Sequence, residues 1–188
     1  MVIKSFFDKL VAFFGLLFLW PLFILVAVFI KIKMPGGPVL FIQRRVGEGG
    51  NLFKLYKFRS MSERHSGSSI SIKGENRITQ VGAVLRKYKI DELPALWNVL
   101  KGEMSFVGPR PDVPSYADKL KGEDRKILEL SPGITGPASL KYSNEEELLA
   151  KQKDPIKHND EVIFPDKVKI NLDYYYNRSL LLGVLGFW

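Results

Sequence analysis

LVAFFGLLFLWPLFILVAVFI, residues Leu10–Ile30, is a run of 21 residues without a single charged side chain. As a straight helix it would be about 32 Å long, which matches the hydrocarbon core of a bilayer. Pro21 lies in its middle, where a proline removes a backbone hydrogen bond and kinks a helix. The run therefore predicts an N-terminal membrane helix that is broken at Pro21.

Both flanks of this run are basic, with Lys4 and Lys9 before it and Lys31 and Lys33 after it. Basic residues beside a membrane segment prefer the cytoplasmic side. A re-entrant helix, which enters, turns and returns, satisfies this preference at both ends, and a plain transmembrane helix is the alternative. A signal peptide is not expected, because the run is too long and no small-residue cleavage site follows it.

The composition narrows the chemistry of the remaining chain. The 188 residues carry a net charge of +8, which suits phosphorylated substrates, anionic lipid or nucleic acid, although ordinary solubilising charge also explains it. Nucleic acid is not expected, because the aromatic residues are not interleaved with the basic runs. No cysteine is present, and His65 and His158 are far apart, so any metal is expected to be a hard ion such as Mg²⁺.

Beyond Pro-Gly-Gly-Pro at 35–38, the pattern predicts a small α+β domain. Two short apolar or alternating runs flank a glycine-rich turn and predict a β-hairpin over 39–43 and 52–58. Helical spacing or composition predicts helices over 78–89, 93–100, 112–130 and 145–151. Residues 62–76 are expected to form a mobile loop and residues 132–137 a turn. The domain is therefore expected to be mostly helical, with one hairpin and the N-terminal helix as its anchor.

Asp91 and Glu92 stand out because they are adjacent and come directly before Pro94 and an apolar run. We expect them at a helix N-terminus, where free N–H groups and the helix dipole stabilise negative charge and attract phosphate. An ionised aspartate can attack phosphorus, and a neighbouring glutamate can position a cation or the nucleophile. Taken alone, the pair is more often an Asp N-cap followed by a solvated glutamate.

Arg110 lies between Pro109 and Pro111, so the backbone that carries its guanidinium is restricted. The fork of donors on such an arginine matches a phosphate, and a surface arginine in a stiff loop is the plainer interpretation. There is no GxxxxGK sequence, which argues against a P-loop nucleotidase.

Several motifs together resemble the bacterial sugar transferase family, specifically its small monotopic phosphoglycosyl transferases. They are FIQRRVG, KLYKFRSM, LRKYKIDELPALWNVLKGEMSFVGPRP and SPGITG, in addition to the apolar N-terminus with its central proline. The resemblance implies transfer of a sugar-1-phosphate from a UDP-sugar to polyprenyl (undecaprenyl) phosphate, with release of UMP. It also implies a bacterial inner-membrane protein with residues 1–34 as a re-entrant helix and residues 35–188 as a catalytic domain on the cytoplasmic face.

The resemblance also implies roles for individual residues. The family's Asp-Glu dyad falls on Asp91, the nucleophile that forms a covalent phosphosugar, and on Glu92, and this dyad is the best candidate to hold Mg²⁺. The expected substrate-binding residues are Lys57, Arg86, Pro109, Arg110, Pro111, Gly133 and Thr135. Arg86 is expected to receive the lipid phosphate and Arg110 to hold the nucleotide.

Some features stay open at this level. Trp20-Pro21 replaces the family's Ser-Pro pair, and PASLKYSNEEELLA follows SPGITG where many relatives have LAQVNGR, so sugar specificity cannot be transferred. The apolar run 180–188 can form a membrane-surface helix, a core helix or a homodimer contact. A non-enzymatic scaffold that binds anionic membrane lipid through its basic face is the alternative to an enzyme.

Overall fold

The computed structural model describes residues 2–62 and 78–178. Its first half contains the helix α1 (Val2–Lys33), the strands β1 (Leu40–Val46) and β2 (Leu52–Phe58), and the helices α2 (Gln80–Lys87) and α3 (Ala95–Lys101). Its second half contains β3 (Ser105–Val107), β4 (Gly133–Thr135), α4 (Pro137–Lys141), α5 (Glu145–Ala150), α6 (Pro155–His158) and α7 (Phe164–Asn177). The expected loop at 62–76 lies almost entirely outside the described residues, as does the apolar run 180–188.

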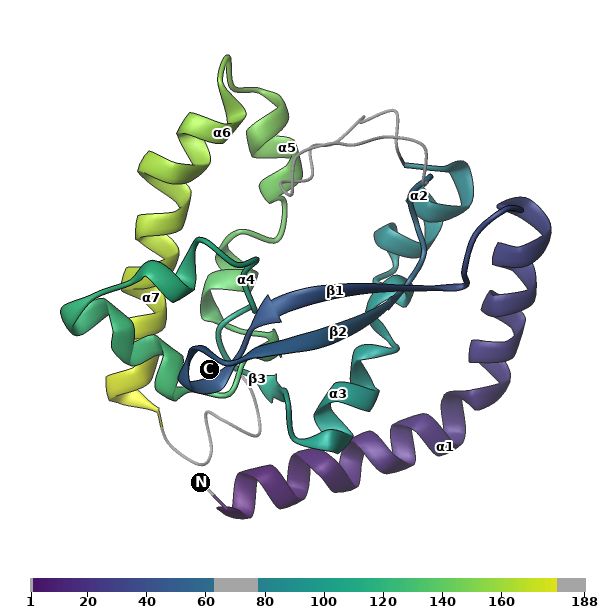
Figure 1. Ribbon diagram of the computed structural model, residues 1–188, viewed down its shortest axis with the longest axis horizontal. Helices are drawn as coiled ribbons and strands as arrows, with labels where there is room; N and C mark the ends of the chain where they lie inside the picture. Colours follow the sequence, from purple (N-terminus) through teal and green to yellow (C-terminus); the bar gives the residue numbers. More distant parts are fainter. Residues whose placement is uncertain (1, 63–77, 179–188) are drawn as a thin grey trace.

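The β-hairpin crosses the middle of the molecule (Figure 1). In this view α1 and α3 lie below the hairpin and α2 lies above its right-hand end, whereas α4 to α7 gather at its left-hand end. The α+β prediction is therefore confirmed, with helices forming most of the domain around a small amount of sheet.

The predicted hairpin is confirmed as an antiparallel pair that runs from Leu40 opposite Phe58 to Val46 opposite Leu52. The predicted helices at 78–89, 93–100 and 145–151 are also confirmed, as α2, α3 and α5. Thr79 begins α2 by accepting a hydrogen bond from the backbone N–H of Gly82, which satisfies one of the free donors at a helix start. Local sequence signals were sufficient in these segments because each element forms from neighbouring residues.

The prediction of a helix over 112–130 is wrong. The structure has two short 3₁₀ segments there, Ala117–Lys119 and Gly122–Glu129, joined by irregular chain. Ser115 has φ 85° and Gly122 has φ 57°, and both values are incompatible with a right-handed helix. The charged and apolar residues of this segment suit a helix, but these two backbone reversals prevent a continuous one.

The turn expected at 132–137 is also wrong in part, because Gly133–Thr135 forms the strand β4, which pairs in parallel with β3. Gly133 donates its N–H to the carbonyl of Pro109 at 2.7 Å, and Gly108 donates to the carbonyl of Thr135 at 2.9 Å. A Cβ on Gly133 would lie 2.2 Å from the backbone nitrogen of Gly108, so a side chain cannot be accommodated there. The glycines of VGPRP and SPGITG thus allow two distant segments to meet.

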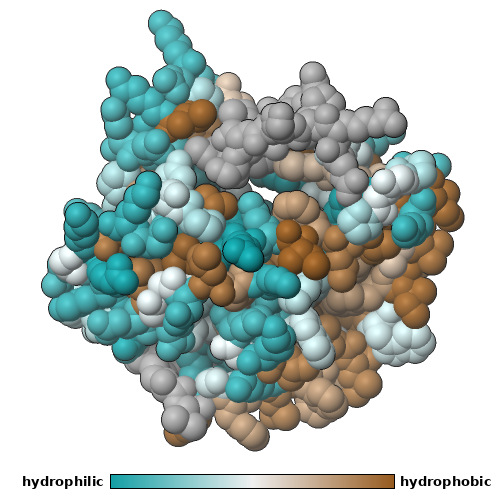
Figure 2. Space-filling model, in the orientation of Figure 1, coloured by the Kyte–Doolittle hydropathy of each residue, from teal (hydrophilic) through white to brown (hydrophobic). Residues whose placement is uncertain are grey.

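The prediction that the helix is broken at Pro21 is wrong, because α1 continues through Pro21 as one helix and curves around one side of the domain (Figure 1). In the part of the chain that the structure describes, it is the one helix long and apolar enough to cross a membrane, and 11% of its most apolar window is buried. Figure 2 shows the hydrophobic surface gathered over the α1 side of the molecule, with hydrophilic surface over α6 and α7. The re-entrant path expected from the sequence stays a prediction.

Helix α1 nevertheless belongs to the core of the domain. Ala12 packs with Leu55 and Val99 in one apolar cluster, which also contains Ala95 and Met104. Further along α1, Val26, Ile30 and Met34 pack with Phe58 and Leu85 in a second cluster. A third cluster on the other side of the hairpin joins Val46, Ala117, Ile127, Leu128 and Val168. The first two clusters fix the segment that carries Asp91 between α1 and the hairpin.

Candidate functional site: a carboxylate pair in a basic cleft

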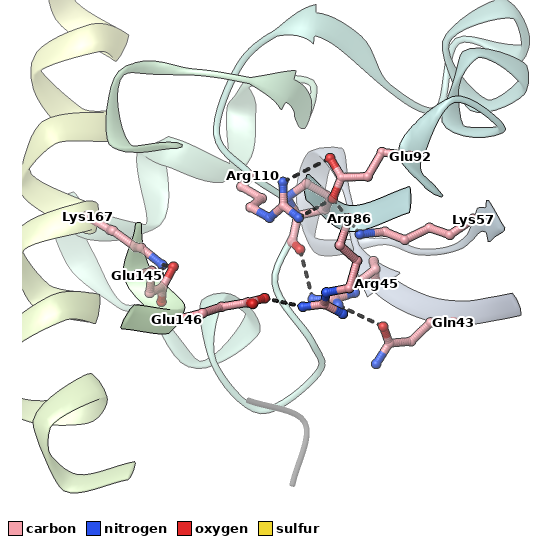
Figure 3. A network of polar contacts seen from close by, with 10 residues as sticks. Gln43, Arg45, Lys57, Arg86, Glu92, Arg110, Glu145, Glu146 and Lys167 are labelled. Carbon is pink, nitrogen blue, oxygen red and sulfur yellow. Dashed lines mark hydrogen bonds and ion pairs between the residues drawn. The ribbon is translucent and has the colours of Figure 1, made fainter. Parts of the chain in front are cut away.

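An open cleft of about 2050 Å³ lies between the two halves of the domain. We call its first side the dyad wall, which comprises the hairpin, α2, the 3₁₀ turn Ile90–Glu92 and the turn at 110–111. Its second side is the C-terminal wall, which comprises α4, α5 and α7. Figure 3 shows the polar network that extends across the cleft.

Asp91 and Glu92 lie in the 3₁₀ turn that directly precedes Pro94 and α3, close to the helix start expected from the sequence. Lys89 has φ 56°, a left-handed conformation that turns the chain away from α2 and into this segment. Asp91 is 6% exposed although it lines the cleft. The backbone reversal therefore places both carboxylates at the dyad wall.

Glu92 is neutralised by two cations. Lys57 Nζ donates to Glu92 Oε1 at 2.8 Å, and Arg110 contacts both carboxylate oxygens, with Nη1 3.4 Å from Oε2. Burial alone would raise the pKa of Glu92, but Arg110 and Lys57 together hold it well below its usual range. Three residues named from the sequence thus form one connected ion-pair group, drawn in Figure 3.

Asp91 has a different environment. Its Oδ1 is buried and makes no hydrogen bond with any residue that the structure describes. Burial raises the pKa of Asp91 above its ordinary value, and the adjacent Glu92 raises it further. One acid of the pair is therefore held as a permanent anion, whereas the other has a raised proton affinity and an oxygen available to a ligand.

The basic residues of the dyad wall are themselves perturbed. Burial lowers the pKa of Lys57 to about 8, and the neighbouring Arg110 acts in the same direction. Burial and Arg110 also lower the pKa of Arg45 to about 10. Burial first, and the neighbouring Arg110 second, thus lower the pKa of both Lys57 and Arg45, and a bound anion would stabilise their charged forms.

Arg86 connects the two walls, since its guanidinium on α2 forms an ion pair with Glu146 on α5. On the C-terminal wall itself, Lys167 lies 2.7 Å from both carboxylate oxygens of Glu145. Arg86, which is expected to receive the lipid phosphate, is thus paired with Glu146, and a phosphate that binds Arg86 would have to replace this carboxylate.

The other predicted binding residues divide into two sets. Pro111 and Thr135 line the cleft, as do Lys57, Arg86 and Arg110. Pro109 and Gly133 do not line it and are joined by a hydrogen bond, and Gly133 lines a small second cavity together with Lys57, Glu92 and Arg110. The direct contacts expected of Pro109 and Gly133 stay predictions, and their observed role is to hold the turn that presents Arg110.

Two cleft residues were missed as site candidates. Arg45 donates to the carbonyl of Pro111 at 3.2 Å and to Gln43 at 2.7 Å, which places it beside Arg110. Asp112 also lines the cleft, and burial raises its pKa to about 6. Arg45 lies within the FIQRRVG motif and Asp112 directly follows VGPRP, so their proximity to motif residues was the available signal.

A metal could be held here by one carboxylate. Among residues 2–62 and 78–178, no three His, Asp or Glu side chains are grouped to hold an ion. The unpaired Asp91 Oδ1 nevertheless fits Mg²⁺, which commonly takes one or two carboxylates and completes its shell with phosphate and water. Glu92 is the weaker candidate of the pair, because Lys57 and Arg110 already neutralise it.

A long apolar helix and a cleft that contains paired carboxylates and buried cations indicate a membrane-associated protein with a site suited to anions. The sequence model of the bacterial sugar transferase family matches residues 1–186, and the chain belongs to that family.

Three relatives show what the chain is similar to. It is 40% identical over 97% of its length to the UDP-N-acetylgalactosamine-undecaprenyl-phosphate N-acetylgalactosaminephosphotransferase of Aeromonas hydrophila. It is 39% identical, again over 97%, to the UDP-glucose:undecaprenyl-phosphate glucose-1-phosphate transferase of Xanthomonas campestris pv. campestris. It spans 41% and 37% of the lengths of these two proteins. The exopolysaccharide production protein ExoY of Sinorhizobium fredii is 36% identical over 97% of the chain, which spans 80% of that relative.

Proposed function

We propose that this protein transfers a sugar-1-phosphate from a UDP-sugar to undecaprenyl phosphate and releases UMP. The observation that carries the proposal is the contrast within the dyad, where Glu92 is locked by two cations and Asp91 keeps an unpaired oxygen in the cleft. The names of the relatives, which pair UDP-sugars with undecaprenyl phosphate, support the same reaction.

In the proposed chemistry, a carboxylate oxygen of Asp91 attacks the phosphorus that carries the sugar. The bond from that phosphorus to the bridging oxygen breaks, and UMP leaves with the bond electrons. A phosphate oxygen of the lipid then attacks the same phosphorus, and the Asp91 carboxylate leaves unchanged. The two substrates would use one site in turn, which suits a soluble donor and an acceptor confined to the bilayer.

The neighbouring residues prepare Asp91 for this role. The raised pKa of Asp91 makes it a stronger base and nucleophile once it has lost its proton. Lys57 and Arg110 hold Glu92 and also lie where the negative diphosphate must come, so they can offset charge without moving far. Mg²⁺ held by Asp91 and the diphosphate would add further positive charge against the leaving UMP.

The packing of α1 supports a monotopic arrangement. Near its start, Asp8 accepts a hydrogen bond from Ser105 at 2.8 Å, and near its end Ile30 and Met34 pack with Phe58. A helix of 32 residues would be about 48 Å long if straight. Because both ends contact the same domain, a path that crosses the bilayer once is disfavoured, and we propose that α1 lies in the cytoplasmic leaflet of the inner membrane.

The direct test of this function is UMP release from a panel of UDP-sugars by the full chain in lipid nanodiscs that contain undecaprenyl phosphate. We expect release by the wild type and a loss of about 1000-fold in Asp91→Asn, since an amide is a poor nucleophile. Asp173→Asn is a control for the substitution itself, because Asp173 is exposed on α7 and does not line the cleft. Normal turnover by Asp91→Asn would exclude Asp91 as the nucleophile, and lipid binding without UMP release from any donor would favour a scaffold.

A further inference from the structure

The C-terminal wall of the cleft contains two buried polar groups that the proposed reaction does not use. Asn171 on α7 is 6% exposed, and its Oδ1 makes no hydrogen bond with any described residue. Ser139 on α4 has a buried Oγ that also makes no hydrogen bond with any described residue. Both residues line the cleft. Burying a polar atom without a partner costs folding free energy, so two such atoms in one wall require an explanation.

The position of Asn171 makes a purely structural role a poor explanation. It lies between Val168 and Tyr174 on the buried face of α7, three residues from each, where an apolar side chain would pack without cost. Asn98, in the core beneath the hairpin, shows what a structural asparagine looks like. It is fully buried, donates to the carbonyl of Lys54 at 2.7 Å and accepts from the N–H of Tyr56 at 3.2 Å.

The two unpartnered groups lie on neighbouring elements. Helix α4 packs against α7, where Lys141 and Tyr142 contact Asp166 at 2.6 and 2.7 Å. A carboxamide oxygen accepts a hydrogen bond, and a serine hydroxyl both donates and accepts. A sugar hydroxyl or acetamido group offers the complementary donors and acceptors.

The charges of the two walls also suit different parts of a UDP-sugar. The dyad wall carries Lys57, Arg86 and Arg110, so it suits the phosphates of the donor. On the C-terminal wall Lys167 balances Glu145, and the groups without partners, Asn171 and Ser139, are uncharged and suit hydroxyl groups.

We infer that Asn171 and Ser139 form the subsite that binds the sugar of the donor, an inference that rests on the proposed function. Ser139 lies three residues after the SPGITG motif, and Asn171 lies further along the chain on α7. Two relatives of nearly equal identity carry names with different sugars, N-acetylgalactosamine and glucose, so overall similarity does not assign the sugar. In this account the C-terminal wall chooses the sugar and the dyad wall performs the transfer.

The test compares the binding of UMP with that of UDP-sugars by calorimetry, using the full chain in nanodiscs. The probes are UMP, UDP-glucose, UDP-galactose and their two N-acetylated counterparts, and the donor that binds the wild type most tightly is taken forward. Asn171→Leu and Ser139→Ala should each weaken that donor about tenfold, the effect of one lost hydrogen bond, and leave UMP affinity within about twofold. Asn171→Leu should also keep or raise the melting temperature, whereas Asn98→Leu should lower it.

Four outcomes would overturn the inference. They are unchanged donor affinity in both variants, equal losses for UMP and the donor, a fall in melting temperature for Asn171→Leu as large as that for Asn98→Leu, and no UDP-sugar binding by the wild type. The absence of UDP-sugar binding by the wild type would also contradict the proposed function. Donor binding with the expected selective loss, but without turnover by the wild type, would support the subsite and contradict the proposed reaction alone.

Discussion

The two walls of the cleft differ in the kind of polar group that lacks a partner. On the dyad wall, Glu92, Lys57 and Arg110 satisfy one another and leave Asp91 as the unpaired acid. On the C-terminal wall, Glu145 and Lys167 pair, but Asn171 and Ser139 have buried atoms without partners among the described residues. Arg45 Nε on the dyad wall is also buried without a partner, so both walls contain such atoms among the described residues. The atoms on the dyad wall belong to charged side chains, whereas those on the C-terminal wall belong to uncharged ones.

The largest effect after loss of Asp91 is expected from Glu92→Gln. This change removes the charge that Lys57 and Arg110 share, so both cations should lose their fixed positions and the pKa of Asp91 should fall toward its ordinary value. We expect kcat to fall by about 100-fold or more and the acid limb of the pH–rate profile to move to lower pH.

Glu123→Gln is the matched control for that experiment, because it makes the same change in an exposed ion pair with Lys126. It should leave kcat unchanged. Equal activity of the Glu92→Gln and Glu123→Gln variants would show that the ion-pair group of the dyad wall is not needed for the reaction.

The second effect concerns stability and compares two asparagines. Asn98→Leu leaves the Lys54 carbonyl and the Tyr56 N–H without their buried partner, and we expect a loss of about 3 kcal/mol in the free energy of unfolding. Asn171→Leu removes an unpaired oxygen and should cost nothing or stabilise the protein. Urea unfolding of both variants measures the difference, and equal losses would mean that Asn171 is a structural asparagine like Asn98.

The third effect is a pH dependence that involves Asp112, which lies between the walls. Burial raises its pKa from 3.8 to about 6 in the folded protein, so the folded state binds more protons than the unfolded state between these values. Stability should therefore fall as pH rises from 4 to 6, by about 2 kcal/mol. Asp112→Asn should remove this slope and raise the melting temperature at pH 8. An unchanged slope in thermal scans of this variant would assign the pH dependence to other groups.

The smallest effect is expected from Glu146→Gln at the contact between the walls. Its ion pair with Arg86 is partly exposed, so its loss should change stability by less than about 1 kcal/mol. Removing this carboxylate should lower KM for undecaprenyl phosphate up to about threefold, because the lipid phosphate no longer has to replace it at Arg86. A higher KM would show that Glu146 assists acceptor binding.

Local sequence signals predicted some elements of the fold and not others. The hairpin, α2 and α3 follow from local signals such as the glycine-rich turn and Pro94, and the hairpin and α2 form most of the dyad wall. The residues 112–130 have a helical composition, yet Ser115 and Gly122 adopt left-handed backbone angles that prevent the helix. The pairing of β3 with β4 joins short strands far apart in sequence, and no local pattern announces such a contact.

For the site, the sequence named the residues but not their partners. Asp91, Glu92, Lys57 and Arg110 were identified through adjacency and family motifs, and the structure brings them together. That Glu92 takes both cations and leaves Asp91 unpaired depends on tertiary packing. Asn171 lies in no motif of the sequence. An unpaired oxygen on a helix face can be recognised only when that face is known to be buried.

The most direct test of the central claim is intact-protein and peptide mass spectrometry after incubation with the preferred UDP-sugar in nanodiscs without undecaprenyl phosphate. We predict a covalent sugar-phosphate on the peptide that contains Asp91, with one UMP released per adduct, and its discharge when undecaprenyl phosphate is added. The Asp91→Asn variant should form no adduct. UMP release that requires the lipid acceptor from the start, with no adduct on Asp91, would contradict the account.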